Sequence, residues 1–170
     1  MSPIAPTNVL FIKLGERGVW ESQCIQNGTL RLGYREVPHD LCMRGQWDQV
    51  HDVLRGIRNN PQAATSDRTQ VQYFYEAPNS VLWVTFYAGR LYWCFSDPGT
   101  LVQNEDGTKT RCTTNRWNDR DIHGRPLTFD NLSGDILAVR GFRGTICKVS
   151  CSDYVAVSHS QLKVWTAVGA

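Results

Sequence analysis

The strongest constraint on the fold is a pair of apolar, aromatic-rich runs within residues 80–96, SVLWVTFYAGRLYWCFS. Both runs are rich in β-branched and aromatic residues, which pack well on a pleated surface. Ala88-Gly89 separates them, and a two-residue break between β-prone runs favours a tight turn. The sequence therefore predicts an antiparallel β-hairpin in the middle of the chain.

Shorter elements precede this hairpin. Residues 8–14 (NVLFIKL) form a short β-prone run and predict a first strand. Residues 19–25 place Val19, Trp20, Cys24 and Ile25 on one face of a short helix, which Asn27-Gly28 ends. Residues 29–34 alternate apolar and polar side chains, so they predict a second strand.

The longest helical pattern lies in residues 45–60, where Trp47, Val50 and Leu54 recur at helical spacing. Residues 63–70 are polar and are interpreted as a linker. Residues 97–114 predict a turn-rich excursion, residues 115–126 a polar loop, and residues 127–157 short strands alternating with glycine-containing turns.

Strand, helix, strand, helix and then several strands indicate an α+β fold. We expect a small, curved, mostly antiparallel sheet or an open β-barrel with flanking helices. A length of 170 residues suits one domain. We interpret residues 1–170 as that domain. It is either a complete protein or, as the stop directly after strand-like residues favours, a domain excised from a larger one.

Composition excludes several classes of protein. No apolar run approaches the ~18 residues that a membrane span requires, and the N-terminus does not resemble a signal peptide. The six cysteines include no CxxC pair, so we expect reduced thiols, a cytoplasmic location, and no metal or other cofactor. A net charge of only +2 means that any nucleic-acid-binding surface must come from local clusters of cations.

Motifs for catalysis are mostly missing. The chain has no Walker loop, no GxGxxG and no GxSxG, and its four histidines never occur at metal-pair spacing. Two weaker alternatives are a Cys94 nucleophile paired with His123, and a nuclease-like metal site at Glu105 and Lys109 with Asp97. We therefore predict a non-catalytic domain, with any nuclease or other catalytic domain lying elsewhere in a longer protein.

Aromatic residues next to cations are the most suggestive functional pattern. Three groups combine them: Lys13, Arg17 and Trp20; Arg31, Tyr34 and Arg35; Arg111, Arg116, Trp117 and Arg120. An unstacked base needs aromatic faces for stacking and cations for its flanking phosphates. The alternative is that the aromatics fill the core, which is expected for Trp47, from its helical spacing, and for at least one of Trp83 and Trp93. Trp117 lies among polar residues and is expected at a surface or pocket.

Residues 11–34 (FIKLGERGVWESQCIQNGTLRLGY) resemble the opening of PUA-like modules of the EVE and YTH type. In these modules a first strand runs into a polar or glycine-containing turn, a short helix and a second strand that ends in an aromatic residue after a small one. Residues 81–96 look like their central hairpin, and residues 132–150 are compatible with their closing strands. The 43-residue stretch from Pro38 to Ser80 exceeds their minimal layout, and Tyr34 stands where relatives often have Trp.

The resemblance implies a module that holds a flipped, modified base in an aromatic pocket. Such modules are often fused to nuclease or motor subunits of bacterial modification-dependent restriction systems. The expected partners are DNA carrying a modified base, with RNA as the alternative, and a nuclease or motor domain in the same or a partner chain. The base pocket is predicted from the aromatic residues Tyr34, Trp117, Trp20, Trp83 and Trp93. Contacts to backbone, phosphate or base edge are predicted from Lys13, Glu16, Arg17, Arg35, Arg116, Arg120 and Arg143.

The competing hypothesis is a non-catalytic protein-interaction or assembly domain of a bacterial defence or regulatory protein. Under it the aromatics are core residues, and a flat apolar patch forms an interface. A third possibility is a small enzyme whose catalytic residues form no recognisable motif.

Overall fold

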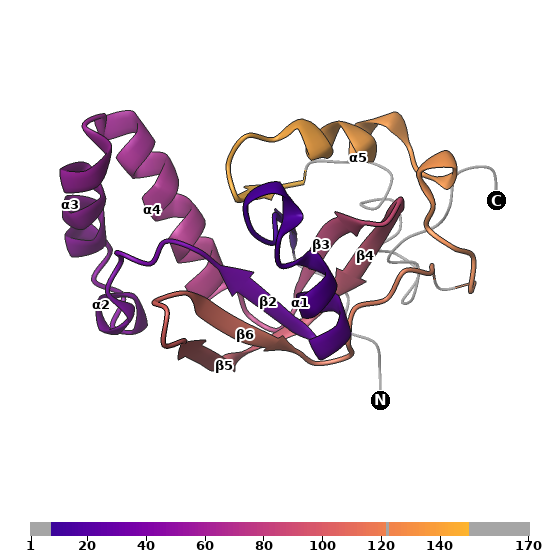
Figure 1. The fold of residues 1–170 in the computed structure, drawn as a ribbon, viewed down its shortest axis with the longest axis horizontal. Helices are drawn as coiled ribbons and strands as arrows, with labels where there is room; N and C mark the ends of the chain where they lie inside the picture. Colours follow the sequence, from indigo (N-terminus) through magenta and orange to yellow (C-terminus); the bar gives the residue numbers. More distant parts are fainter. Residues whose placement is uncertain (1–7, 122, 150–170) are drawn as a thin grey trace.

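The computed structural model describes residues 8–121 and 123–149, and these form an α+β fold with two sheets that do not close into a barrel (Figure 1). The first sheet has the strand order β4-β3-β1-β7, and the second has the order β2-β6-β5. Helices α2, α3 and α4 gather at one end of the molecule, away from the β3–β4 hairpin (Figure 1). The predicted α+β class, with a small sheet and flanking helices, is confirmed.

Strand β1 (Asn8–Ile12) lies at the centre of the first sheet. It pairs in parallel with β3 (Val81–Tyr87) and antiparallel with β7 (Ile146–Lys148). Alternate residues of β1 enter different hydrophobic clusters: Leu10 and Ile12 join one, and Val9 and Phe11 join the other. Because side chains alternate across a strand, this sheet is buried on both faces, which explains the continuous apolar run in its sequence.

The central hairpin is confirmed. Strand β3 pairs antiparallel with β4 (Arg90–Cys94) through a two-residue turn. Ala88 and Gly89 both have positive φ, 51° and 77°, as the hairpin turn that matches strand twist requires. This turn projects the hairpin tip beyond the sheet (Figure 1).

The second sheet contains β2 (Thr29–Leu32), β5 (Ser96–Gln103) and β6 (Lys109–Thr113). The predicted turn-rich excursion is therefore largely a hairpin, with Gly107 at a φ of 85° in its turn. Two cations on β6, Lys109 and Arg111, are fully buried. Lys109 donates to two loop carbonyls, and Arg111 donates to carbonyls at the end of α4.

Helix α1 (Glu21–Asn27) ends at Gly28, which adopts the left-handed conformation that the sequence predicted. The short α2 (His39–Met43) precedes α3 (Trp47–Arg58), which fulfils the prediction of a helix within residues 45–60.

The interpretation of residues 63–70 as a linker is wrong, because they belong to α4 (Pro61–Glu76). Its buried face includes the polar residues Asp67 and Gln70, which interrupt the apolar pattern. Both are satisfied: Asp67 accepts from Tyr34, and Gln70 accepts from the backbone N–H groups of residues 145 and 146.

The predicted series of strands after residue 127 is also wrong over most of its described part. This segment contains the 3-10 helix η2 (Phe129–Asn131), α5 (Gly134–Ala138) and the 3-10 helix η3 (Val139–Gly141) before β7. Ser133 caps α5 by accepting from the N–H of Ile136, a short-range signal for a helix start. The expected strand residues 150–157 lie outside the described residues.

No helix in the described ranges is both long enough and apolar enough to cross a membrane. The described cysteines are free thiols: Cys24, Cys42 and Cys94 are buried, Cys147 is half-buried, and Cys112 is exposed. Cys151 lies outside the described residues.

Candidate functional site

Two tight turns border the most distinctive cavity. The first turn joins β1 to α1 through the 3-10 helix η1 (Glu16–Gly18), and Gly15, Arg17 and Gly18 all have positive φ. The second is the Ala88-Gly89 tip of the β3–β4 hairpin. Because β1 and β3 are parallel neighbours, both turns lie at the same end of the sheet.

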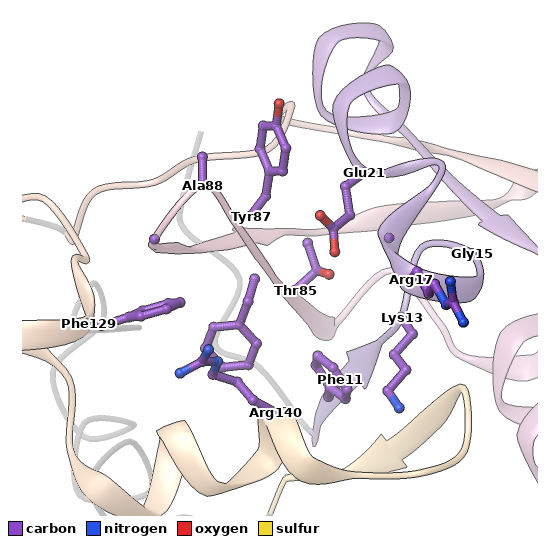
Figure 2. Close-up of a pocket in the computed structure, with 13 residues that line it drawn as sticks. Phe11, Lys13, Gly15, Arg17, Glu21, Thr85, Tyr87, Ala88, Phe129 and Arg140 are labelled. Carbon is purple, nitrogen blue, oxygen red and sulfur yellow. The ribbon is translucent and has the colours of Figure 1, made fainter.

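The cavity between these turns has a volume of about 430 Å³, within the range of small-molecule sites. Figure 2 shows its lining, which combines aromatic, cationic and acidic side chains from β1, η1, α1, β3 and the segment after β4. The lining residues are Phe11, Lys13, Gly15, Arg17, Gly18, Glu21, Thr85, Phe86, Tyr87, Ala88, Gly89, Phe129 and Arg140. We call this space the turn cavity.

Three cations border the turn cavity: Lys13, Arg17 and Arg140. Within the described part of the chain, none of the three forms an ion pair. Arg140 places its guanidinium 4.2 Å from the ring centre of Phe129, and Lys13 holds its ammonium 6.0 Å from the ring centre of Phe142. Their charges are therefore available to an anionic ligand.

Glu21 contributes the acidic group. Its side chain points from α1 toward Thr85 across the cavity (Figure 2). Burial raises the pKa of Glu21, and no hydrogen bond or ion pair to it exists within residues 8–121 and 123–149. A Cβ at Gly18 would lie 2.5 Å from the Glu21 carboxyl group, so glycine at this position lets the carboxylate pack against the turn.

Aromatic rings form the apolar wall. Phe86 packs against Phe11 with ring centres 5.7 Å apart, and against Phe129 with ring centres 5.9 Å apart. Tyr87 stands at the hairpin tip, half-buried, beside Tyr92. The turn cavity thus offers flat apolar surfaces, together with three cations and a carboxylate that form no ion pair among the described residues.

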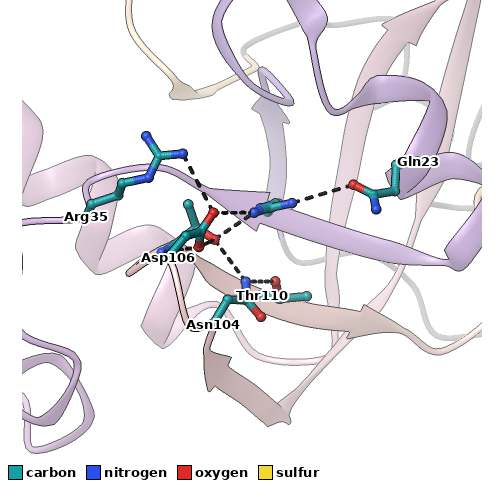
Figure 3. A network of polar contacts seen from close by, with 7 residues as sticks. Gln23, Arg35, Asn104, Asp106 and Thr110 are labelled. Carbon is teal, nitrogen blue, oxygen red and sulfur yellow. Dashed lines mark hydrogen bonds and ion pairs between the residues drawn. The ribbon is translucent and has the colours of Figure 1, made fainter.

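A second cavity, of about 460 Å³, differs because Arg31 and Asp106 in its lining bind each other. Arg31 donates to Asp106 at 2.6 Å, while Asp106 also accepts from the backbone and side chain of Thr108. Figure 3 shows this network around Asp106, with Arg35 directed at the same carboxylate. These hydrogen bonds, first those from Thr108, hold the pKa of Asp106 at about 2. This network links β2 to the β5–β6 turn. Because Arg31, Thr108 and Asp106 bind one another, we infer that the network has a structural role.

A third cavity, of about 390 Å³, contains the predicted pocket residue Tyr34. The Tyr34 hydroxyl donates to Asp67 at 2.8 Å, and Arg58 donates to the same carboxylate at 2.6 Å. Burial raises the pKa of Tyr34, so its hydroxyl stays a donor. Its charged groups Arg58 and Asp67 are thus paired with each other.

The structure does not assemble the predicted aromatic pocket. Trp117 is only 8% exposed and donates its indole N–H to the Thr29 carbonyl, so it is a core residue rather than a pocket wall facing Tyr34. Trp83 is fully buried against Phe74 and Arg111. The prediction that Trp117 and Trp83 line a base pocket is therefore wrong, because a ring whose faces are already packed in the core cannot stack on a base.

The other two tryptophans predicted for the pocket, Trp20 and Trp93, contact different groups. Trp20 is half-buried, with the Arg31 guanidinium 4.6 Å from its ring centre. Trp93 packs against the second hydrophobic cluster and donates its indole N–H to the Arg120 carbonyl.

Of the predicted contact residues, Lys13 and Arg17 line the turn cavity. Glu16 is exposed on the same turn but is not part of the lining. The remaining predicted cations are exposed and lie elsewhere: Arg35 near Asp106, Arg116 after β6, Arg120 bonded to the Gly124 carbonyl, and Arg143 before β7.

Sequence reasoning missed Glu21, Tyr87, Phe129 and Arg140 as site residues. Tyr87 directly precedes the predicted hairpin turn, which could have drawn attention to it. Phe129 and Arg140 lie in the segment interpreted as strands, and no local pattern brings them to the first turn.

The two catalytic alternatives find no geometric support. Cys94 is fully buried, and Lys109 points into the core to donate to the Tyr34 and Val37 carbonyls, whereas Glu105 is exposed. Among the residues that the structure describes, no three His, Cys, Asp or Glu side chains converge as metal ligands would.

Comparison with known proteins gives no relatives: no protein-family model matches the chain, and neither curated proteins nor solved structures show a match to it.

Proposed function

We propose that this domain binds nucleic acid and takes one base, extruded from DNA, into the turn cavity. The observation that supports the proposal most is the combination of lining groups: aromatic faces, a carboxylate and three cations that have no ion-pair partner in the described part of the chain surround one space. Stacking on aromatic side chains holds an extruded base, and cations at the rim hold its flanking phosphates. DNA rather than RNA, and a modified base as its target, follow from the resemblance in layout to PUA-like modules.

The position of the turn cavity also agrees with that resemblance. It lies where the first strand enters its glycine-containing turn and where the central hairpin returns. The proposal extends to a cytoplasmic domain that works with a nuclease or motor domain in the same or a partner chain.

The protein-interaction alternative has less support. The largest exposed apolar side chains in the described residues are Val19, Met43, Ile57 and Val102, and they belong to four separate segments of the chain. An interface would need such side chains to form one patch of several hundred Å².

The test is a binding panel of single- and double-stranded oligonucleotides with unmodified, methylated, hydroxymethylated and glucosylated bases, measured over a series of salt concentrations. Each phosphate contact contributes about −0.9 to the slope of log K against log salt for duplex DNA. Replacing Lys13, Arg17 or Arg140 singly with Ala should make the slope less negative by about that amount. The matched control is Arg55→Ala, since Arg55 is an exposed cation on α3, at the other end of the molecule (Figure 1).

Tyr87→Ala tests the stacking surface. Loss of one stacking contact is worth about 1–3 kcal/mol, which corresponds to roughly 5- to 150-fold in affinity. The effect should vanish on an oligonucleotide with an abasic site in place of the target base. Equal loss with Arg55→Ala, or no binding to any oligonucleotide at low salt, would contradict the proposal and favour a protein partner.

A further inference from the structure

Glu21 is the one carboxylate among the described residues that lines the turn cavity, and its surroundings determine which ligand groups it would accept hydrogen bonds from. Three cations border the same cavity, yet none of them pairs with Glu21 within residues 8–121 and 123–149. A half-buried carboxylate without a partner is costly in free energy, so a bound ligand that brings N–H donors to it gains from satisfying it.

An ionised carboxylate has two acceptor oxygens and no donor. The Watson–Crick edges of the bases differ in what they offer to it. Guanine presents two adjacent donors, its N1–H and its N2 amino group, which match the two oxygens. Adenine and cytosine place a ring acceptor beside their amino donor, and thymine flanks one N–H with two carbonyl oxygens. The acceptor nitrogen or oxygen of these three bases would face the carboxylate and repel it.

Resting on the proposed function, we infer that Glu21 selects a guanine-class base by accepting from its N1–H and N2–H groups. The half-buried rings of Phe86, Phe129 and Tyr87 supply the stacking surface for the purine, and the buried Phe11 supports Phe86 from the core. Lys13, Arg17 and Arg140 are left to hold phosphate. A modification that this site accepts must preserve both donors, so it lies away from N1 and N2.

The test uses single-stranded oligonucleotides that differ at one central position: guanine, hypoxanthine, 2-aminopurine, adenine, cytosine, thymine or an abasic site. Binding is measured at mildly alkaline pH, where the carboxyl group is ionised. We expect guanine to bind about tenfold or more tightly than adenine, as for a bidentate contact to a base edge. Hypoxanthine keeps N1–H but lacks the N2 amino group, so it should fall between guanine and adenine. 2-Aminopurine has an acceptor at N1 beside its amino group, so it should bind about as weakly as adenine.

Glu21→Gln keeps the side-chain shape but replaces one acceptor with a donor. It should reduce the preference for guanine over adenine to about twofold or less while leaving the affinity for the abasic strand unchanged. Glu16→Gln removes an exposed acid from the same turn and should leave the preference as it is in the original protein.

The outcomes separate the two proposals. If a base is preferred to the abasic site but guanine and adenine bind equally, or Glu21→Gln keeps the guanine preference, the role of Glu21 is wrong and the base-binding proposal stands. If no strand binds, or all bind like the abasic strand, both proposals are wrong.

Discussion

Replacing Arg111 with Met should destabilise the fold strongly, although it removes a charge from the core. Arg111 is fully buried on β6, and its guanidinium donates four hydrogen bonds at 2.7 to 3.0 Å. Two of them reach the carbonyls of Phe74 and Ala77 at the end of α4, where a helix leaves its last carbonyls without internal partners. A cation at this end also opposes the helix dipole favourably.

The expected magnitude follows from the groups left behind. Arg111→Met fills a similar volume but deprives three carbonyl oxygens, those of Phe74, Ala77 and Ser96, of a buried donor. Each unsatisfied buried acceptor costs about 1–3 kcal/mol. Desolvation of the guanidinium, which lowers the pKa of Arg111 to about 10, is relieved in the variant and offsets part of this cost. We expect a net loss of about 3–5 kcal/mol in the free energy of unfolding.

The assay is urea unfolding followed by circular dichroism, with thermal melting as a second measurement. For a domain of this size, 1 kcal/mol corresponds to about 2–4 °C in Tm, so the variant should melt roughly 6–20 °C lower. Arg111→Lys keeps the charge but has fewer directed donors, so its stability should lie between that of the original protein and that of Arg111→Met. The control is Arg44→Met, because Arg44 forms only an exposed pair with Asp40 and should change stability by less than about 0.5 kcal/mol.

A variant with Met at this position that equals or exceeds the original protein in stability would refute the reasoning. That result would mean that the desolvation of the guanidinium outweighs its four hydrogen bonds, as happens in some buried ion pairs.

Four further outcomes are expected. Trp117→Ala should lower the free energy of unfolding by about 3–5 kcal/mol, as Trp47→Ala should, because both indoles are buried; a Trp117 variant that melts like the original protein would contradict its core position. Ala88→Asn should raise Tm, because Asn tolerates the φ of 51° at the hairpin tip better than Ala does; a lower Tm would oppose this view of the turn. Thiol titration of the native protein should find Cys112 reacting first, and denaturation without reductant should expose close to six free thiols; two or fewer would indicate disulfides. The hydrogen bonds to Asp106 lower its pKa from 3.8 to about 2, so their stabilisation is present above pH 3.8 and is lost as pH falls to about 2; the Tm difference from Asp106→Asn should shrink over that window, and a constant difference would exclude this linkage.

Only some residues of the candidate site could be predicted from the sequence. Lys13 and Arg17 were predicted because they lie in a polar turn directly after an apolar strand, and both line the turn cavity. Phe129 and Arg140 were not, because they reach the cavity from a segment more than a hundred residues later in the chain. Trp117 was misplaced for the opposite reason: its neighbours in sequence are polar, but its indole turns inward to the Thr29 carbonyl.

Local sequence determined those elements whose signal is contained in a few neighbouring residues. The hairpin followed from two β-prone runs around Ala88-Gly89, the end of α1 from Gly28, and α3 from its apolar spacing. Turn geometry and helical periodicity act over two to four residues, so the order of side chains suffices to read them.

Only the tertiary structure determined which polar side chains are buried and which residues line the turn cavity. Asp67, Lys109 and Arg111 look like surface residues in the sequence, yet each is buried against a partner at least nine residues away. A polar side chain can enter the core only where its hydrogen bonds are satisfied, and those partners come from other elements. The same dependence on long-range packing places a helical segment, rather than the expected strands, beside the first turn, and so sets which cations, rings and carboxylate share one cavity.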